Sequence, residues 1–351
     1  MTRVLLTTVD LNVDGGVASY MRAVQPHFTL PVEYLVVGER PGPASERPGR
    51  VRRLVSDYVR YWRAVRGGRY DLVHLNPSLE RKALLRDGLL VLLAQLAGVR
   101  VVVFFHGWVP SCERALDRRM PQWLFARSFL RADSIVVLAN AFADRLRGWG
   151  YRGRIDVLAT AVEDRLFDVN PSSNTSGLRV LFLARLERDK GVFTAVEAVR
   201  QLQERGLDVR LTVAGDGPAE PELRKQLGQL RHAQAIGYVR GQAKLDALRE
   251  SDVYLFPTEY GEGMPISVLE AMAAGLPVVT RPVGGLADFF VDGQMGYLSD
   301  STDPTVFADL INLLFNVGLR KEIAAYNSEY AREHFTGLAA AAALEAIYSI
   351  I

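Results

Sequence analysis

The segment GEGMPISVLEAMAAG, residues 261–275, contains two glutamates in a setting that suits ligand binding. Glu262 lies in a glycine-rich turn, whereas Glu270 lies among apolar residues. A carboxylate with little polar surface around it needs hydrogen-bond donors, because burying an unpaired charge is costly. The two hydroxyls of a ribose would supply such donors. We therefore predict that Glu270 binds a ribose and that Glu262 lies in a binding loop.

The start of the helix that carries Glu270 has two interpretations. Proline is tolerated in the first helical turn, so Pro265 can be the first helical residue, which would place Glu270 inside the helix. Ser267 and Glu270 also match the S-x-x-E capping box, which would start the helix at Ser267 and make Glu270 a structural residue. The sequence leaves both open.

A pair of cations in LFLARLERDKGV, residues 181–192, indicates a site for a diphosphate. Arg185 follows an apolar strand pattern, and Lys190 comes five residues later, beside Gly191 and the expected start of a helix. Two cations near a helix N-terminus can hold a diphosphate. The alternative is a surface ion pair with Glu187 or Asp189.

Glycines and a histidine follow strands in the N-terminal half. Gly15 and Gly16 open a helix, where glycine lets a ligand approach the backbone closely, although the pair also suits a simple tight turn. His106 follows the apolar run RVVVFF and can donate a hydrogen bond to a substrate hydroxyl, or else be satisfied by local backbone. His74 is expected to be structural.

Two further turns follow strands in the C-terminal half. Gly215 lies in VAGDGP, a tight turn from a strand into a helix. Tyr238 and Val239 follow another strand and could place a ring and backbone amides against a base. Each of these signals is weak alone.

The elements that must position these residues alternate regularly between short apolar strands and longer helical patterns. Uninterrupted alternation indicates parallel sheets covered on both faces, with ligands at the carboxyl ends of the strands. Strands are expected at 3–9, 33–38, 71–76, 100–106, 134–139, 155–159, 178–185, 209–215, 233–238, 252–257 and 276–280.

The expected fold class is α/β, with two doubly wound, Rossmann-like domains facing across a cleft. The polar segment 168–177 reads as an interdomain linker. We expect an acceptor-binding domain at 1–165, a donor-binding domain at 166–335, and an apolar C-terminal helix at 336–351 that packs back on the N-terminal domain.

Composition excludes several classes of protein. The 351 residues are 49% hydrophobic and 23% charged, as in a globular protein with a full core. The single cysteine, Cys112, excludes an internal disulfide, and no histidine spacing suggests a metal site. The apolar run at the N-terminus is too short for a secretory signal, so we expect none, and the apolar run at 88–105 is broken by Arg100. We therefore expect a cytoplasmic protein with no bound metal and no cofactor.

The charge is unevenly distributed along the chain. Residues 1–165 contain 25 Lys/Arg and 16 Asp/Glu, a net charge of +9, whereas the remainder has a net charge of −7. Nine arginines lie between Arg40 and Arg69. The stretch suits a helix with a solvated face or, alternatively, contact with an anionic membrane or a charged acceptor. We expect no nucleic-acid partner, and the sequence says nothing about the oligomeric state.

The segment EGMPISVLEAMAAGLPVV, residues 262–279, resembles the E-x7-E motif of the retaining family-4 glycosyltransferases, which have the GT-B fold. The similarity extends to the paired glycines, to HG at 106–107, and to ARLERDKG, VAGDGP and IGYV. Many relatives have E-G-F-G in the loop where this chain has a proline, Pro265, which removes one amide donor. Asp288 stands where many relatives have glutamate.

The resemblance implies a role for each matching residue. Gly15 and Gly16 would line the diphosphate and acceptor side, and His106 would contact the transferred sugar. Arg185 and Lys190 would neutralise the leaving nucleoside diphosphate. Glu262 would lie beside the donor sugar and Glu270 would bind the ribose. The donor-binding set is completed by Gly215, Tyr238, Val239, Gly263, Met264, Pro265 and Ile266.

The implied activity is metal-independent transfer of a sugar from a UDP- or GDP-linked donor to a saccharide, lipid-linked or small-molecule acceptor, with retention of configuration. Alternatives are a nucleoside diphosphate sugar epimerase of the same fold and a non-catalytic donor-binding subunit. A nicotinamide oxidoreductase is disfavoured because the G-x-G-x-x-G fingerprint is missing.

Overall fold

The computed structural model describes residues 2–13, 15–38, 49–171 and 177–351. Met1, Asp14, residues 39–48, which include Arg40 and Arg47, and the linker residues 172–176 lie outside the described residues. Contacts divide the chain into two compact units. Unit 1 comprises Met1–Glu163, Gly261–Met264 and Thr336–Ile351, and unit 2 comprises Asp164–Tyr260 and Pro265–Phe335.

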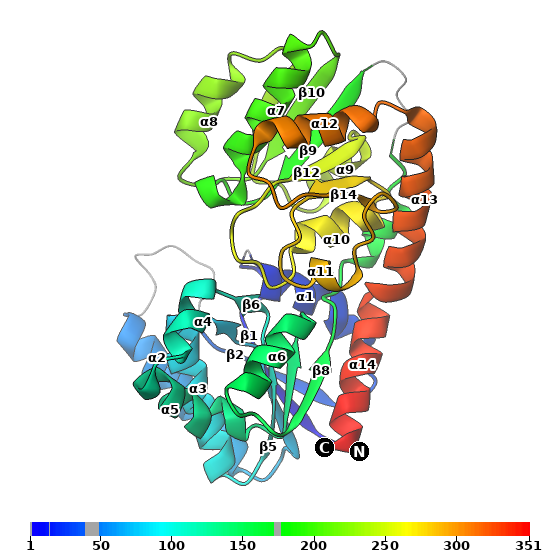
Figure 1. Cartoon of the computed structure of the whole chain (residues 1–351). Coiled ribbons are helices and arrows are strands. Elements are labelled where there is room, and N and C mark those ends of the chain that lie inside the picture. Colours follow the sequence, from blue (N-terminus) through cyan, green and yellow to red (C-terminus); the bar gives the residue numbers. More distant parts are fainter. Residues whose placement is uncertain (1, 14, 39–48, 172–176) are drawn as a thin grey trace. The chain divides into compact units, whose positions relative to one another are not determined.

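Unit 1 is built on a six-stranded parallel sheet with the order β2-β1-β3-β5-β7-β8 (Figure 1). Its central strands are buried apart from Arg100 at the start of β5, and their side chains are mostly apolar. Its strands and helices are β1 (Val4–Thr8), α1 (Gly16–Val24), β2 (Val32–Val36), α2 (Arg50–Arg66), β3 (Leu72–Leu75), β4 (Ser78–Leu79), α3 (Arg81–Leu96), β5 (Arg100–Phe104), β6 (Gly107–Trp108), α4 (Pro110–Leu116), α5 (Arg119–Arg127), β7 (Ser134–Val137), α6 (Asn140–Gly148), β8 (Arg154–Val157) and α14 (Gly337–Ile350).

Unit 2 has a second six-stranded parallel sheet, in the order β11-β10-β9-β12-β13-β14 (Figure 1). Helix α7 packs on α12, and α10 packs on α13. Its elements are β9 (Leu178–Leu183), α7 (Val192–Glu204), β10 (Val209–Ala214), α8 (Glu220–Leu227), β11 (Ala233–Gly237), α9 (Gln242–Arg249), β12 (Val253–Phe256), α10 (Ile266–Ala273), β13 (Val278–Thr280), α11 (Leu286–Phe289), β14 (Gly296–Leu298), α12 (Pro304–Leu313) and α13 (Val317–His334).

The two sheets confirm the predicted α/β class with two Rossmann-like halves. Every predicted strand is present within one or two residues of its expected ends. The sequence analysis did not anticipate β14 or the short pair β4 and β6. These have only two or three residues each, too few to show a hydrophobic period.

The C-terminal helix α14 packs back on unit 1, as predicted. The Glu345 carboxylate accepts hydrogen bonds from the Thr29 hydroxyl at 2.7 Å and from the Leu30 amide at 2.8 Å. The hydroxyl of buried Tyr348 lies in hydrogen-bond contact with Nδ1 of buried His74 on β3. The end of the chain therefore stabilises the same sheet that its beginning forms.

Candidate functional site

The polar residues of unit 2 gather where the strand order of its sheet reverses. The chain runs outward from β9 to β10 and β11, and then returns to place β12 on the other side of β9. At such a switch point, the loops after the two central strands diverge and leave room for a ligand. Arg185 and Lys190 follow β9, and the loop Thr258–Tyr260 follows β12.

Those two loops are joined at one carbonyl group. The carbonyl oxygen of Asp189 accepts hydrogen bonds from the amides of Glu259, at 2.7 Å, and Tyr260, at 2.9 Å. It also accepts one from the Thr258 hydroxyl, at 3.2 Å. Lys190, the next residue, places its ammonium group 3.8 Å from the centre of the Tyr260 ring, in a cation–π contact. The position of Lys190 is thus determined by the loop that precedes Glu262.

Glycines allow these loops to approach closely. Gly191 has a φ of +81°, and a Cβ atom there would lie 2.2 Å from the carbonyl oxygen of Pro257. Gly215 has a φ of +144°, and a Cβ atom there would lie 1.9 Å from the carbonyl oxygen of Ala184. A side chain at either position would push apart loops that must touch. Gly215 was predicted to bind the donor. The structure shows that a glycine is needed there for close packing against Ala184.

Arg185, the second predicted cation, forms a surface ion pair with Glu187, which is the alternative to a diphosphate site given above. Its guanidinium lies 3.2 Å from the Glu187 carboxylate, and its side chain is 67% exposed. An exposed ion pair of this kind contributes little to stability, so the side chain is available to exchange this partner for an anionic ligand.

Glu270 is buried and ionically paired. Its side chain is 8% exposed, and Oε1 lies 2.5 Å from the Nζ atom of Lys244 on α9, which is 11% exposed. One oxygen of this acid therefore has its donor in Lys244, a residue that sequence reasoning missed, and the contact with a ribose stays a prediction. The scarcity of lysine, with five in the chain, was the signal that could have found Lys244.

Helix α10 begins at Ile266, with Pro265 as its extended N-cap. The capping-box interpretation is wrong, because no side chain caps this helix and the Ser267 hydroxyl instead bonds the Tyr254 hydroxyl at 2.7 Å. Placing Pro265 as the first helical residue was also wrong, by one position. Its backbone ψ of 101° lies outside the helical range, so the helix begins at Ile266.

The predicted base-binding turn follows β11 in unit 2. Tyr238 is 49% exposed, whereas Val239 is 9% exposed. The ring of Tyr238 is therefore accessible for stacking, and Val239 anchors the turn in the core.

In unit 1, His106 follows β5 and is held by Asn76, which follows β3. His106 Nε2 lies 2.7 Å from Asn76 Oδ1, and Asn76 Nδ2 donates to the Thr7 carbonyl at 2.9 Å. Because the Asn76 amide group donates to a carbonyl, its oxygen must be the acceptor from His106. The proton of a neutral His106 is therefore on Nε2, which leaves Nδ1 as an acceptor. Sequence reasoning missed Asn76, although it directly follows a strand.

Aromatic rings enclose the His106 imidazole. The ring centroid of Phe104 lies 4.1 Å away and that of Tyr20 lies 4.7 Å away. Burial, followed by the nearby His74 imidazole, lowers the pKa of His106 to about 3. His106 is therefore neutral near pH 7 and serves as a hydrogen-bonding group rather than as a cation.

The loop Gly261–Met264 belongs to unit 1 and lies against the backbone around His106. A Cβ atom on Gly263 would lie 2.8 Å from the His106 carbonyl oxygen, and one on Gly261 would lie 2.2 Å from Pro110 Cδ. Met264 is buried. Both glycines are needed for this approach, which places Glu262 in the same loop environment as His106.

The glycine pair after β1 opens α1 as predicted. Gly15 is the N-cap, with a φ of +144°, and Gly16 is the first helical residue. No side chain caps the amides of this first turn in the structure. These amides are the type of donor that binds anionic groups.

Neither a metal-binding cluster nor a membrane-spanning helix is found among the described residues. No group of three or more His, Cys, Asp or Glu side chains in this part of the chain could hold a metal ion. Within the same residues, no helix is both long and apolar enough to cross a membrane.

Comparison with known proteins identifies both halves of the chain. Residues 165–334 match the family described as "Glycosyl transferases group 1", and residues 11–161 match "Glycosyl transferase 4-like domain". The phosphatidyl-myo-inositol mannosyltransferase of Mycobacterium leprae is 30% identical over 370 residues, covering 94% of this chain and 92% of that protein. The putative colanic acid biosynthesis glycosyltransferase WcaL of Escherichia coli is 29% identical over 247 residues, covering 68% of this chain and 59% of that protein.

Solved structures share the fold of both units. Anabaena Alr3699/HepE, solved in complex with UDP, aligns over 100% of both chains with a TM-score of 0.75 at 16% identity. Sucrose-phosphate synthase of Thermosynechococcus elongatus aligns over 99% of this chain and 98% of that chain, with a TM-score of 0.76 at 19% identity. These neighbours show that the two parallel α/β halves form the GT-B fold, and the family matches make the chain a glycosyltransferase. The chain belongs to the group 1, family-4 glycosyltransferases.

Proposed function

We propose that this glycosyltransferase moves a sugar from a nucleoside diphosphate sugar to an acceptor hydroxyl with retention of configuration and without a metal ion. The observation that carries the proposal is the switch point of unit 2. There, Lys190 lies on Tyr260 beside the β12 loop, and α10, which follows that loop, presents the buried carboxylate of Glu270. A cation for a diphosphate and an acid for a ribose are the groups that a nucleoside diphosphate requires.

In the proposed reaction, the bond from the anomeric carbon to the diphosphate oxygen breaks and a bond to the acceptor oxygen forms on the same face. The acceptor hydroxyl gives its proton to the departing phosphate oxygen. Lys190 and Arg185 stabilise the charge that develops on the diphosphate, which is the task that a metal performs in other phosphate chemistry.

The carboxylate of Glu270 would bind the ribose hydroxyls through Oε2 while Oε1 keeps its bond to Lys244. Glu262 and His106 would position the sugar, with Nδ1 of neutral His106 accepting a hydrogen bond from a sugar hydroxyl. The exposed ring of Tyr238 would stack on the base.

The donor carries UDP or GDP in this proposal. UDP is the nucleotide in the Anabaena neighbour, and a sugar-nucleotide screen decides between the two. For the acceptor, we propose a saccharide or lipid-linked hydroxyl, because the related proteins are named for colanic acid biosynthesis and for a phosphatidyl-inositol acceptor.

A screen of nucleoside diphosphate sugars by thermal shift, with and without EDTA, tests the donor and the metal. We expect one nucleotide to raise the melting temperature equally in both conditions. Stabilisation by NAD(P) alone, or only without EDTA, would contradict the proposal. Conversion of the donor to its epimer without an acceptor would favour an epimerase.

Once an acceptor is found, the anomeric proton coupling of the product tests retention.

Lys190→Ala tests the diphosphate clamp. We expect a roughly 10- to 100-fold weaker affinity for the nucleoside diphosphate, the usual effect of losing a charged hydrogen-bond donor. Lys225→Ala on α8 is the matched control, because Lys225 is an exposed lysine of the same unit. Equal affinities for the two variants in calorimetric titration would remove Lys190 from the site.

A further inference from the structure

The exposed apolar side chains of this protein are concentrated on three helices of unit 1. Among the described residues, 17 large hydrophobic side chains are exposed, and ten of them lie on α2, α3 and α5. Globular proteins leave such side chains exposed singly, so a cluster of this size indicates an interaction surface. We call it the three-helix surface, and its apolar members are Val51, Val55, Val59, Leu85, Leu89, Leu92, Leu96, Met120, Trp123 and Leu124.

The apolar residues form a stripe on each helix. On α3 they recur at intervals of four, three and four residues, from Leu85 (64% exposed) to Leu96 (76% exposed). On α2 the spacing is four residues, and on α5 it is three and then one. Residues at these intervals lie on one side of a helix. Each helix thus has a buried apolar side and a second, exposed one.

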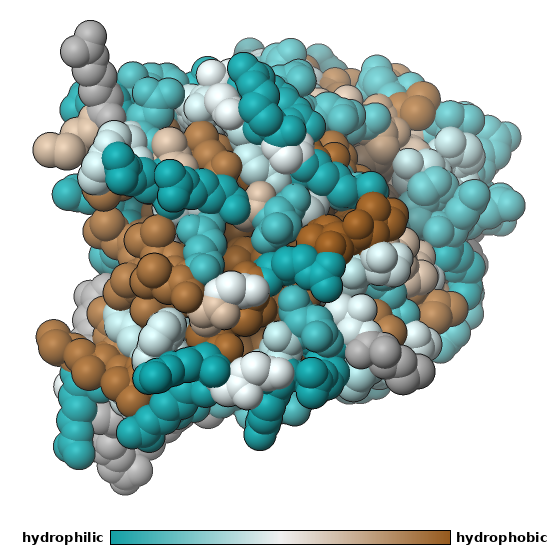
Figure 2. All heavy atoms as spheres, turned by 90° about the horizontal axis from the view of Figure 1, so that it is seen from below, coloured by the Kyte–Doolittle hydropathy of each residue, from teal (hydrophilic) through white to brown (hydrophobic). Residues whose placement is uncertain are grey.

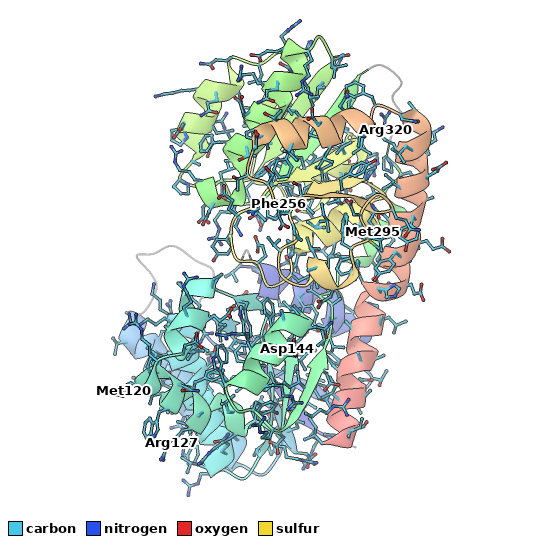
Figure 3. All side chains as sticks on the ribbon, viewed as in Figure 1. Met120, Arg127, Asp144, Phe256, Met295 and Arg320 are labelled. Carbon is cyan, nitrogen blue, oxygen red and sulfur yellow. The ribbon has the colours of Figure 1, made fainter. Side chains whose placement is uncertain are left out.

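The stripes lie on neighbouring helices. Helix α3 contacts both α2 and α5. Met120 and Arg127 project from α5 at the outer edge of unit 1 in Figure 3. Figure 2 shows brown apolar side chains gathered with teal hydrophilic ones on the left of the face seen from below, the side on which Figure 1 places these helices.

The charges on the three helices are almost all positive. Their sequences contain eleven Lys and Arg but two acids, Asp57 and Asp87. Both acids are buried, and each pairs with an arginine of its own helix, Arg60 at 2.6 Å and Arg86 at 2.7 Å. The outward side of the helices therefore presents cations and apolar groups without an exposed acid.

We propose that the three-helix surface docks this protein on a lipid bilayer with anionic headgroups. Apolar stripes bordered by arginines are the composition that enters a bilayer interface, where the apolar groups enter the acyl region and the cations meet the headgroups. Two copies of this surface would place like charges together, which disfavours self-association. Nucleic acid would pair the arginines but leave the leucines in water. The proposal goes beyond the transfer reaction and stands independently of it.

The test is co-sedimentation of the full chain with vesicles of phosphatidylglycerol and phosphatidylcholine, compared with phosphatidylcholine alone. The apolar variant carries Leu85→Gln, Leu89→Gln and Leu96→Gln. The charge variant carries Arg52→Gln, Arg63→Gln and Arg66→Gln. The matched control in unit 2 carries Leu313→Gln, which removes an exposed leucine, and Arg210→Gln, which removes an exposed arginine.

We expect binding to the anionic vesicles only, reduced by added salt and lowered about tenfold or more in each variant but not in the control. Unchanged circular dichroism would show that the variants are folded. The proposal is overturned by equal binding of variants and control, by failure to bind anionic vesicles, or by tighter binding to an oligonucleotide. A dimer in sedimentation velocity that the apolar variant dissociates would also overturn it.

Discussion

At the residue scale, the candidate site consists of side chains that residues from other elements hold in place. Lys190 lies on the Tyr260 ring, Glu270 pairs with Lys244, and His106 bonds Asn76. In each case the motif residue was visible in the sequence and its partner was not, because the partner comes from a different strand or helix. The partners determine the rotamer, and for His106 the tautomer, in which the motif residue meets a ligand.

Replacing Tyr260 tests whether its ring positions Lys190. Tyr260→Leu should weaken nucleoside diphosphate binding by roughly two- to fivefold, because a partly exposed cation–π contact contributes about 0.5–1 kcal/mol. Tyr260→Phe is the control and should bind as the unmodified protein does, since the ring remains. Calorimetric affinities that fall equally for both variants would indicate a role for the hydroxyl instead.

The buried histidine His74 makes unit 1 sensitive to acid. Burial lowers the pKa of His74 to about 3, whereas an unfolded histidine titrates near 6.5. Between these values the unfolded chain binds the extra proton, so the free energy of unfolding is largest above pH 6.5 and falls as the pH drops toward 3. The free energy of unfolding lost through His74 alone is at most about 1.4 kcal/mol per pH unit.

Urea unfolding at pH 7.5, 6 and 5 measures this effect. All four tryptophans belong to unit 1, so their fluorescence follows that unit alone. His74→Gln should make the midpoint less dependent on pH, even if it lowers stability at pH 7.5. An unchanged dependence would show that other groups cause the acid sensitivity.

At the element scale, the site depends on loops that meet closely after parallel strands. The turn after β9, with η5 (Arg188–Lys190), reaches the loop after β12 because Gly191 permits backbone contact with Pro257. The turn after β10 reaches the first loop because Gly215 and Gly217 approach Ala184 and Leu186. Strand order thus brings the three loops together, and glycine lets them touch.

Gly191→Ala tests this contact, with Gly206→Ala as its control. The φ angles are nearly equal, +81° and +84°, but a Cβ atom at Gly206 meets nothing within 4 Å. Both variants should lose about 1–2 kcal/mol from the backbone angle. Gly191→Ala should lose a further ~1–3 kcal/mol and bind nucleotide more weakly, because Pro257 must move. Equal stabilities by circular dichroism in urea would contradict the close contact.

At the scale of the whole molecule, each unit contains its own sheet. Unit 1 combines the first part of the chain with its last helix, α14. Helix α14 covers it through Glu345 and Tyr348, the latter against His74 and stacked with Phe28. The exposed three-helix surface belongs to the same unit. Unit 1 therefore depends on a helix that follows unit 2 in sequence.

Tyr348→Ala should lower the stability of unit 1 by about 3–5 kcal/mol, the usual cost of removing a buried aromatic side chain. Leu338→Ala on the same helix is the control, because Leu338 is 61% exposed, and should change stability little. Tryptophan fluorescence in urea measures both variants. Similar midpoints for the two would show that α14 does not stabilise the sheet.

The sequence alone determined the alternation of strands and helices, the two Rossmann-like halves and the position of the candidate site residues after strands. These features are local, because hydrophobic period and turn residues are properties of short segments. The tertiary structure decided which partners hold Lys190, Glu270 and His106, and that α10 begins at Ile266. It also decided that Leu85, Leu89 and Leu96 of the leucine-rich helix α3 remain exposed. A hydrophobic period shows which residues share a side of a helix, but only the packing of neighbouring elements decides whether that side is covered.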